Sequence, residues 1–147
     1  MSENTFSLLK QSSFFGGLTD ACLEQISTSS NVQVIHLKQG EIIFRKQEVA
    51  DRFWLVISGS IVLHQENLRE PFVHIGCEES RVIGISGLVQ PGNRHPVTMQ
   101  AGSDMELVEI KSAFKEDLNL ESRLVIAENA SQFLLQKLIE FRTAEYE

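Results

Sequence analysis

The sequence predicts a mainly β fold with flanking helices: an eight-stranded double-stranded β-helix, or jelly roll, with two helices before it and a long helix after it. Three observations lead to this class. The hydrophobic period is helical over residues 1–30, changes to short apolar runs over 31–111, and becomes helical again over 112–147. The length of 147 residues and the 42% hydrophobic content suit one domain with its own core.

Two short helices are expected within residues 1–30, separated at the stretch FFGGLTD. The two glycines of this stretch interrupt the helical pattern, and Thr19 can cap the N-terminus of the second helix. Cys22, Leu23 and Ile26 follow at helical spacing, so we expect them to form the buried face of that helix.

Eight short runs rich in β-branched and aromatic residues follow within residues 31–111. Turn and loop residues separate them, and no helical pattern lies between most of them, which favours an antiparallel sandwich or jelly roll. Gly40 and Gly59 stand at expected tight turns. The runs are VQVIHL, EIIF, RFWLVISG, SIVLHQ, PFVHIG, RVIGI, PVTMQA and MELVEI.

The C-terminal segment is expected to contain a short helix with Ser112 as its N-cap and a long helix from about Glu121 to Tyr146. The long helix carries two apolar stripes. One stripe has the spacing of a coiled-coil seam and contains Leu124, Ala127, Ser131, Leu134, Leu138 and Phe141. The other contains Ile126, Ala130 and Phe133. We expect one stripe to pack on the sandwich and the other on a second copy, giving a homodimer; the alternative is one wide face within a monomer.

Composition excludes several classes of function. The formal net charge of −7 argues against a large nucleic-acid surface, and we expect no DNA-reading helix-turn-helix after the long helix. No apolar run approaches the length of a membrane span, and the N-terminus lacks a signal-peptide pattern. Cys22 and Cys77 are far apart and are expected to be buried thiols, so the expected location is cytoplasmic.

Catalytic and metal-binding patterns are missing from the sequence. A cupin-type metal centre needs a His-x-His pair and further converging ligands, whereas the four histidines here are scattered singly. The stretch GISGL is one residue too short for a GxSxG nucleophile motif. We therefore expect neither enzyme activity nor a cofactor.

The segment LKQGEIIFRKQEVADRFWLVISGSIVL, residues 37–63, resembles the cyclic nucleotide-binding domain, and SSFFGGLTDACLEQI resembles that family's N-terminal helix entry. The order of the expected elements is similar as well. This domain is the regulatory module of the catabolite activator protein family, of protein kinase A regulatory subunits and of some ion channels. The resemblance implies a sensory domain that signals through a dimer helix.

The family binds its ligand in a phosphate-binding cassette, and the stretch VIGISGLVQPGNRHPVTMQA, residues 82–101, resembles it. Gly84 matches the cassette entry, but Ile85 stands where the family has a Glu that accepts a hydrogen bond from the ribose. Losing such a charge-assisted bond costs on the order of 1.5–3 kcal/mol. Counting forward from Gly84 places Arg94 at the phosphate-binding position, whereas counting back from the strand that contains Thr98 places His95 there.

The resemblance therefore leaves three interpretations of the cassette open. It binds cyclic AMP or cyclic GMP weakly, or it binds another anion through Arg94 and backbone amides, or it is vestigial and the chain is a non-sensing protein–protein interaction module. Ser86 is either a phosphate-facing hydroxyl or a helix N-cap. The candidate ligand-binding residues are Gly84, Ile85, Ser86, Gly87, Arg94, His95 and Thr98.

Overall fold

Two antiparallel sheets packed face to face form the centre of the computed structural model, which describes residues 2–64, 73–76 and 81–146. Within these residues each sheet has four strands, in the orders β1-β8-β3-β6 and β2-β7-β4-β5. The strands are β1 (Val32–Leu37), β2 (Ile42–Phe44), β3 (Arg52–Ser58), β4 (Ser60–His64), β5 (Val73–Gly76), β6 (Arg81–Ile83), β7 (Thr98–Ala101) and β8 (Met105–Lys111). The predicted β-sandwich with flanking helices is confirmed.

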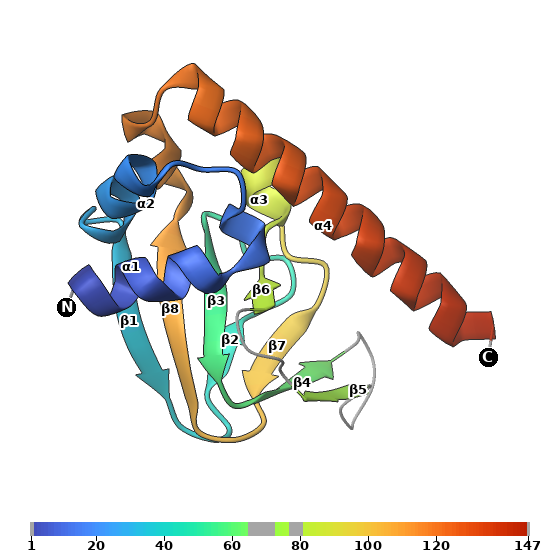
Figure 1. Cartoon of the computed structure of the whole chain (residues 1–147). Coiled ribbons are helices and arrows are strands. Elements are labelled where there is room, and N and C mark those ends of the chain that lie inside the picture. Colours follow the sequence, from blue (N-terminus) through green and yellow to red (C-terminus); the bar gives the residue numbers. More distant parts are fainter. Residues whose placement is uncertain (1, 65–72, 77–80, 147) are drawn as a thin grey trace.

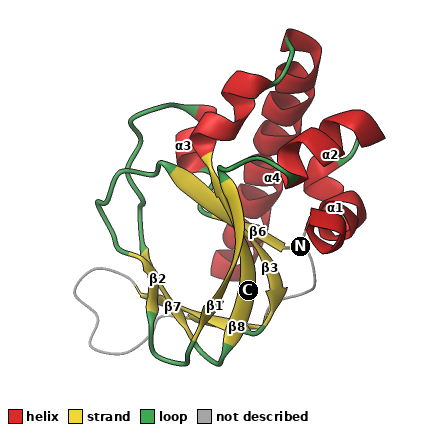
Figure 2. Cartoon of the chain, turned by 90° about the vertical axis from the view of Figure 1, so that its left-hand side faces the viewer, coloured by secondary structure: helices red, strands yellow, loops and turns green. Residues whose placement is uncertain are grey.

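The helices gather on one side of the sandwich (Figures 1 and 2). They are α1 (Ser2–Gln11), the 3-10 helix η1 (Ser13–Phe15), α2 (Asp20–Ser27), α3 (Ser86–Val89), the 3-10 helix η2 (Ser112–Asp117) and α4 (Leu120–Tyr146). Among the described residues, no helix is both long enough and apolar enough to cross a membrane.

The N-terminal helices form as their sequence predicts. The Thr19 Oγ1 accepts a hydrogen bond from the Cys22 backbone N–H at 3.1 Å, which caps α2. Cys22, Leu23 and Ile26 are buried on one face of this helix, also as expected. Cys22 is a free thiol, and Cys77 lies outside the described residues.

Strand β3 separates two hydrophobic cores. Its side chains alternate in direction, so Phe53 and Leu55 pack against the helices, in what we call the helix-side core. Trp54 and Val56 face the opposite sheet, in what we call the inter-sheet core. Because both faces of β3 are covered, four consecutive residues are buried, and the sequence shows an unbroken apolar run there instead of alternation.

The long helix α4 runs from Leu120 to Tyr146, close to the predicted bounds, and its C-terminal end extends away from the sandwich (Figure 1). Ile126 and Ala130 are buried in the helix-side core and Phe133 packs on that core, as expected for the stripe that contacts the sandwich. The assignment of Ser112 as an N-cap is wrong, because Ser112 is the first residue of η2 and Lys111 precedes it without a side-chain cap.

The turn glycines are where the sequence places them. Gly59 joins β3 to β4 with a φ of 111°, and a Cβ at this position would lie 2.6 Å from the Met105 side chain. Gly40 has a φ of 94° in the turn before β2. Both backbones lie in the left-handed region that favours glycine.

The side-chain amide of Asn129 holds α4 against the N-terminal segment. The Asn129 Nδ2 donates to the Phe14 and Gly16 carbonyl oxygens, each at 2.8 Å. We expect Asn129→Ala to lower the free energy of unfolding by about 1–3 kcal/mol, since two carbonyl groups lose their partner. Urea denaturation measures this change.

The matched control is Gln132→Ala, one turn further along the same helix, where the side chain is exposed. This substitution should change the free energy of unfolding by less than about 0.5 kcal/mol. Equal losses in the two variants would show that the Asn129 bonds do not hold the helix in place.

Candidate functional site

The cassette begins at Gly84, between β6 and α3. Gly84 has a φ of 80°, and a Cβ there would lie 2.8 Å from the Trp54 ring. Glycine is therefore required both by the backbone conformation and by the indole packed against it. The structure supplies a packing reason for Gly84 that needs no ligand.

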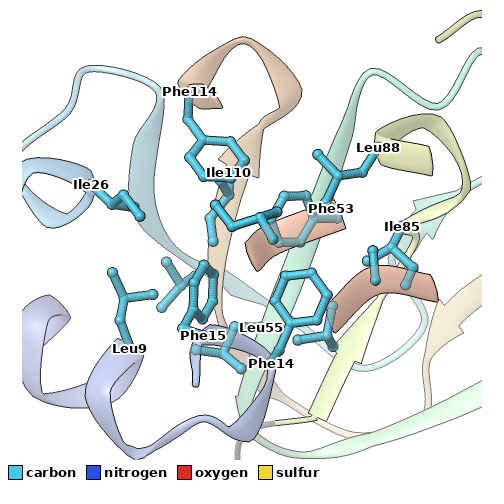
Figure 3. Close-up of a cluster of buried hydrophobic side chains, with 14 of the residues drawn as sticks. Leu9, Phe14, Phe15, Ile26, Phe53, Leu55, Ile85, Leu88, Ile110 and Phe114 are labelled. Atoms are coloured by element: carbon cyan, nitrogen blue, oxygen red, sulfur yellow. The ribbon is translucent and has the colours of Figure 1, made fainter. Parts of the chain in front are cut away.

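The Ile85 side chain points into the helix-side core and is 3% exposed. Figure 3 shows it with Leu88 among the aromatic and aliphatic side chains of that core, which include Phe53 and Phe14. The inclusion of the Ile85 side chain among the ligand-binding residues is therefore wrong. The apolar side chain at this position is used for packing between α3 and β3.

Ser86 opens α3 but does not cap it. The N-cap position belongs to Ile85 and has no side-chain hydrogen bond, so the N-cap interpretation of Ser86 is wrong. The Ser86 Oγ is buried and has no hydrogen-bond partner among the described residues. Buried hydroxyls are normally paired, which makes this oxygen an exception that needs an explanation.

Gly87 lies against the backbone of the loop that precedes β3. A Cβ on Gly87 would lie 1.6 Å from the Ala50 carbonyl oxygen, so only glycine allows the two segments to approach this closely. Gly87 therefore has a steric role between α3 and the 47–50 loop.

Three backbone hydrogen bonds join residues 47–50 to residues 93–95, and we call this pairing the loop clasp. The Ala50 N–H donates to the Asn93 carbonyl at 2.8 Å, the His95 N–H to Glu48 at 2.9 Å, and the Gln47 N–H to His95 at 2.8 Å. The clasp fixes which cassette side chains point inward.

The two candidates for the phosphate-binding position lie on opposite sides of the backbone. Arg94 is exposed, and its Nη1 donates to the Gln47 carbonyl oxygen at 2.7 Å. His95 is buried, with 3% exposure, and its ring stacks on Phe44 at a centroid distance of 3.9 Å. Arg94 thus holds the 47–50 loop, while His95 fills space beneath it.

Two effects of the surroundings shift the pKa of His95 in opposite directions. Burial lowers the pKa of the imidazole below its usual value, because the cation loses its hydration. The negative charges of Glu48 and Asp51 oppose this effect and raise the pKa. Loss of hydration is the larger contribution, so the neutral ring is favoured.

Thr98, the last candidate, opens β7 and contacts the loop after β2. Its Oγ1 accepts a hydrogen bond from the Lys46 backbone N–H at 2.8 Å. The structure therefore brings Arg94, His95 and Thr98 to the 46–50 loop, while Ile85 and Leu88 point to the helix-side core.

A polar group that the sequence analysis missed lies at the end of β8. Glu109 accepts hydrogen bonds from Arg52 Nη1 at 3.1 Å, Trp54 Nε1 at 3.1 Å and Gln33 Nε2 at 3.0 Å. Its side chain is only 12% exposed. The sequence signal was present: Glu109 continues the alternation of Met105 and Leu107, which face inward.

Asp51 completes this polar group. Its carboxylate is paired with the guanidinium of Arg52, Oδ1 to Nε at 3.0 Å, and this hydrogen bond holds the Asp51 pKa below its usual value. Among the described residues, no three metal-ligating side chains come together, so this group is a hydrogen-bonded charge network and not a metal cluster.

Comparison with known proteins identifies the family. The model of the cyclic nucleotide-binding domain matches residues 34–118, more than half of the chain, and the chain belongs to this family. Its members are regulatory domains, typically without enzymatic activity. A comparison with curated proteins finds no relative of this chain.

Solved structures share the fold at low sequence identity. A candidate cyclic nucleotide-binding protein from Geobacter metallireducens is similar with a TM-score of 0.74 and 21% identity, over 90% of this chain and 96% of that one. The catabolite activator protein of Thermus thermophilus has a TM-score of 0.68 and 21% identity, over 89% and 60%.

The regulatory subunit of a cAMP-independent protein kinase A from Trypanosoma brucei is a third similar structure. It has a TM-score of 0.76 and 13% identity, and the match covers 98% of this chain but 49% of that chain. The present chain thus spans about half the length of this regulatory subunit.

The contact between Gly87 and Ala50 yields a test of the loop clasp. We expect Gly87→Ala to destabilise the fold by more than about 2 kcal/mol, because the new methyl group displaces the Ala50 carbonyl and breaks the adjacent pairing with Asn93. Thermal or urea denaturation measures the loss.

Gly92→Ala is the control, because Gly92 has a φ of 89° but open space around its Cβ position. Only the cost of the left-handed backbone, about 1–2 kcal/mol, is expected for this variant. A Gly87→Ala protein as stable as the Gly92→Ala protein would contradict the close approach.

Proposed function

We propose that the chain works as a regulatory interaction module that keeps the cyclic nucleotide-binding fold without cyclic nucleotide recognition. One observation carries this proposal: Ile85, at the position of the ribose-binding carboxylate, is 3% exposed and part of the helix-side core. A side chain buried in this way offers neither an acceptor nor space to a ribose hydroxyl.

The arginine and histidine positions support the same function. The guanidinium of Arg94 donates to the Gln47 carbonyl, and the imidazole of His95 is stacked on Phe44 beneath the loop. A phosphate bound through Arg94 would share the guanidinium with the Gln47 carbonyl oxygen. One similar structure is the regulatory subunit of a protein kinase A that is described as cAMP-independent. The fold is thus found in a kinase with that description.

The experiment is calorimetric titration of the native chain with cyclic AMP, cyclic GMP and cyclic dinucleotides. We expect no saturable heat up to millimolar concentrations, because the ribose acceptor is absent. The Arg94→Ala variant serves as the specificity control. Saturable heat in the native chain that disappears in Arg94→Ala would refute the proposal.

A ligand-sensing module is the second candidate function, and the Ser86 hydroxyl favours it. This oxygen is buried without a partner among the described residues, and a bound anion would supply an acceptor for its proton. If a nucleotide or another phosphate compound binds in the titration and Ser86→Ala abolishes the binding, sensing replaces the interaction module as the function.

Dimerisation through α4 is part of the proposed function. The core-facing stripe of the helix lies against the sandwich, whereas Leu120 and Leu124 are 80% and 61% exposed and Leu135 is 59% exposed. Ala127 and Ser131, on the same side of the helix, are exposed as well. An exposed row of leucines at this spacing supports packing against a second α4.

Two neighbouring leucines of α4 differ in their exposure. Leu134 is partly buried against the helix-side core, so its assignment to the seam stays a prediction, whereas the neighbouring Leu135 is exposed and is added to the seam. The side chains of Leu138 and Phe141 lie outside the described part of the chain, so their seam assignment stays a prediction.

Sedimentation equilibrium tests the dimer. We expect the native chain to sediment as a dimer and Leu124→Glu as a monomer, because a carboxylate in the seam would lose its hydration. Gln132→Glu introduces the same charge at an exposed position outside the seam and should remain dimeric. A native chain that sediments as a monomer would refute this part of the proposal.

A further inference from the structure

A cavity of about 430 Å³ lies outside most of the cassette. Its lining comes from β2, the loop before β3, β3 itself and β8, and His95 is the only one of the candidate cassette residues that contributes. The volume lies within the range of about 300–1,000 Å³ that small-molecule sites occupy.

The charge of the lining is negative. Glu48, Asp51 and Glu109 contribute carboxylates, and Arg52 is the single guanidinium among the described lining residues. The guanidinium is shared between Asp51 and Glu109, at 3.0 and 3.1 Å. Glu48 has no ion-pair partner among the described residues; its Oε1 accepts only the Arg45 backbone N–H, at 2.6 Å.

His95 provides an independent sign of a ligand. The residue is 3% exposed and lines the cavity, yet neither ring nitrogen forms a hydrogen bond with a described residue. Its ring is held by stacking on Phe44 and by contact with Trp54, at centroid distances of 3.9 and 6.3 Å. A donor placed in the cavity can therefore bond to the unprotonated ring nitrogen of His95.

The remaining walls of the cavity are apolar. Ile43 and Val49 supply aliphatic surface, and Phe44 and Trp54 supply stacked aromatic rings, 5.4 Å apart. The Trp54 indole N–H is already bonded to Glu109 and is not free for a ligand. The cavity therefore offers acceptors and negative charge next to apolar surface, and these favour a ligand that is both cationic and aliphatic.

We propose that this cavity binds a small aliphatic ammonium compound, with the ammonium group between the Glu48 carboxylate and the His95 ring and the carbon chain against Ile43 and Val49. The ammonium donates to the Glu48 carboxylate, which has no cationic partner among the described residues, and to the unprotonated ring nitrogen of His95. The charge of this ligand is opposite to that of a cyclic nucleotide.

Trp54, the only tryptophan of the chain, lies in the cavity wall and reports binding through its fluorescence. The probe is putrescine, a four-carbon diamine, compared with butanediol and succinate, which have the same number of carbons without charge and with negative charge. At constant ionic strength we expect a saturable change with putrescine alone, at millimolar or lower concentration.

Two variants test the assigned contacts. Glu48→Gln keeps the oxygen that accepts from Arg45 but removes the charge, and it should weaken putrescine binding roughly tenfold. His95→Phe keeps a ring on Phe44 without an acceptor nitrogen and should also weaken binding. Glu106→Gln, an equal charge change at a residue that pairs with His36 and does not line the cavity, should alter affinity less than about twofold.

A saturable putrescine response that weakens in Glu48→Gln and His95→Phe but not in Glu106→Gln supports the site. The proposal is overturned by an equal response to succinate or butanediol, by equal weakening in Glu48→Gln and Glu106→Gln, or by no response to putrescine at all. Putrescine is a cation and cyclic nucleotides are anions. The putrescine experiment can therefore fail or succeed whatever the outcome of the nucleotide titration.

Discussion

The burial of β3 on both faces is the constraint on which the rest of the structure depends. The strand contributes Phe53 and Leu55 to the helix-side core and Trp54 and Val56 to the inter-sheet core. Hydrophobic burial is the main favourable term in folding, and here one strand contributes to it in both directions. The 3-10 helices η1 and η2, the opposite sheet and the start of the cassette all pack against these four residues.

The cassette illustrates this dependence. The Trp54 ring lies where a side chain on Gly84 would be, and the next residue, Ile85, turns to the other side and packs with Phe53. A segment that in the family receives an anion is here tied to the core on one side and to the 47–50 loop on the other. Binding a nucleotide in the family's manner would require Ile85 to be replaced by a carboxylate in a place without water, which is energetically unfavourable.

The face of β3 that carries Trp54 ends in charged side chains. Trp54 bonds Glu109, and the same carboxylate binds Arg52, so the inter-sheet core ends in a charge network and a cavity. Acidic groups around an apolar cavity discriminate against phosphate by repulsion and favour cations. Gly84 and Ile85 of the cassette thus pack against opposite faces of this strand, and His95 of the cassette lines the cavity together with Trp54.

The sequence by itself determined the fold class, because hydrophobic period, turn glycines and the Thr19 cap are local signals and each was found where expected. It also showed that the Ile85 side chain cannot accept a hydrogen bond. Only the tertiary structure decided that this side chain is in the core, that Arg94 points out and His95 in, and that Glu109 meets Arg52. The physical reason is that neighbours such as Ala50 and Gly87, or Trp54 and Glu109, are far apart along the chain, and the direction of a loop side chain is set by these long-range contacts and not by the local pattern.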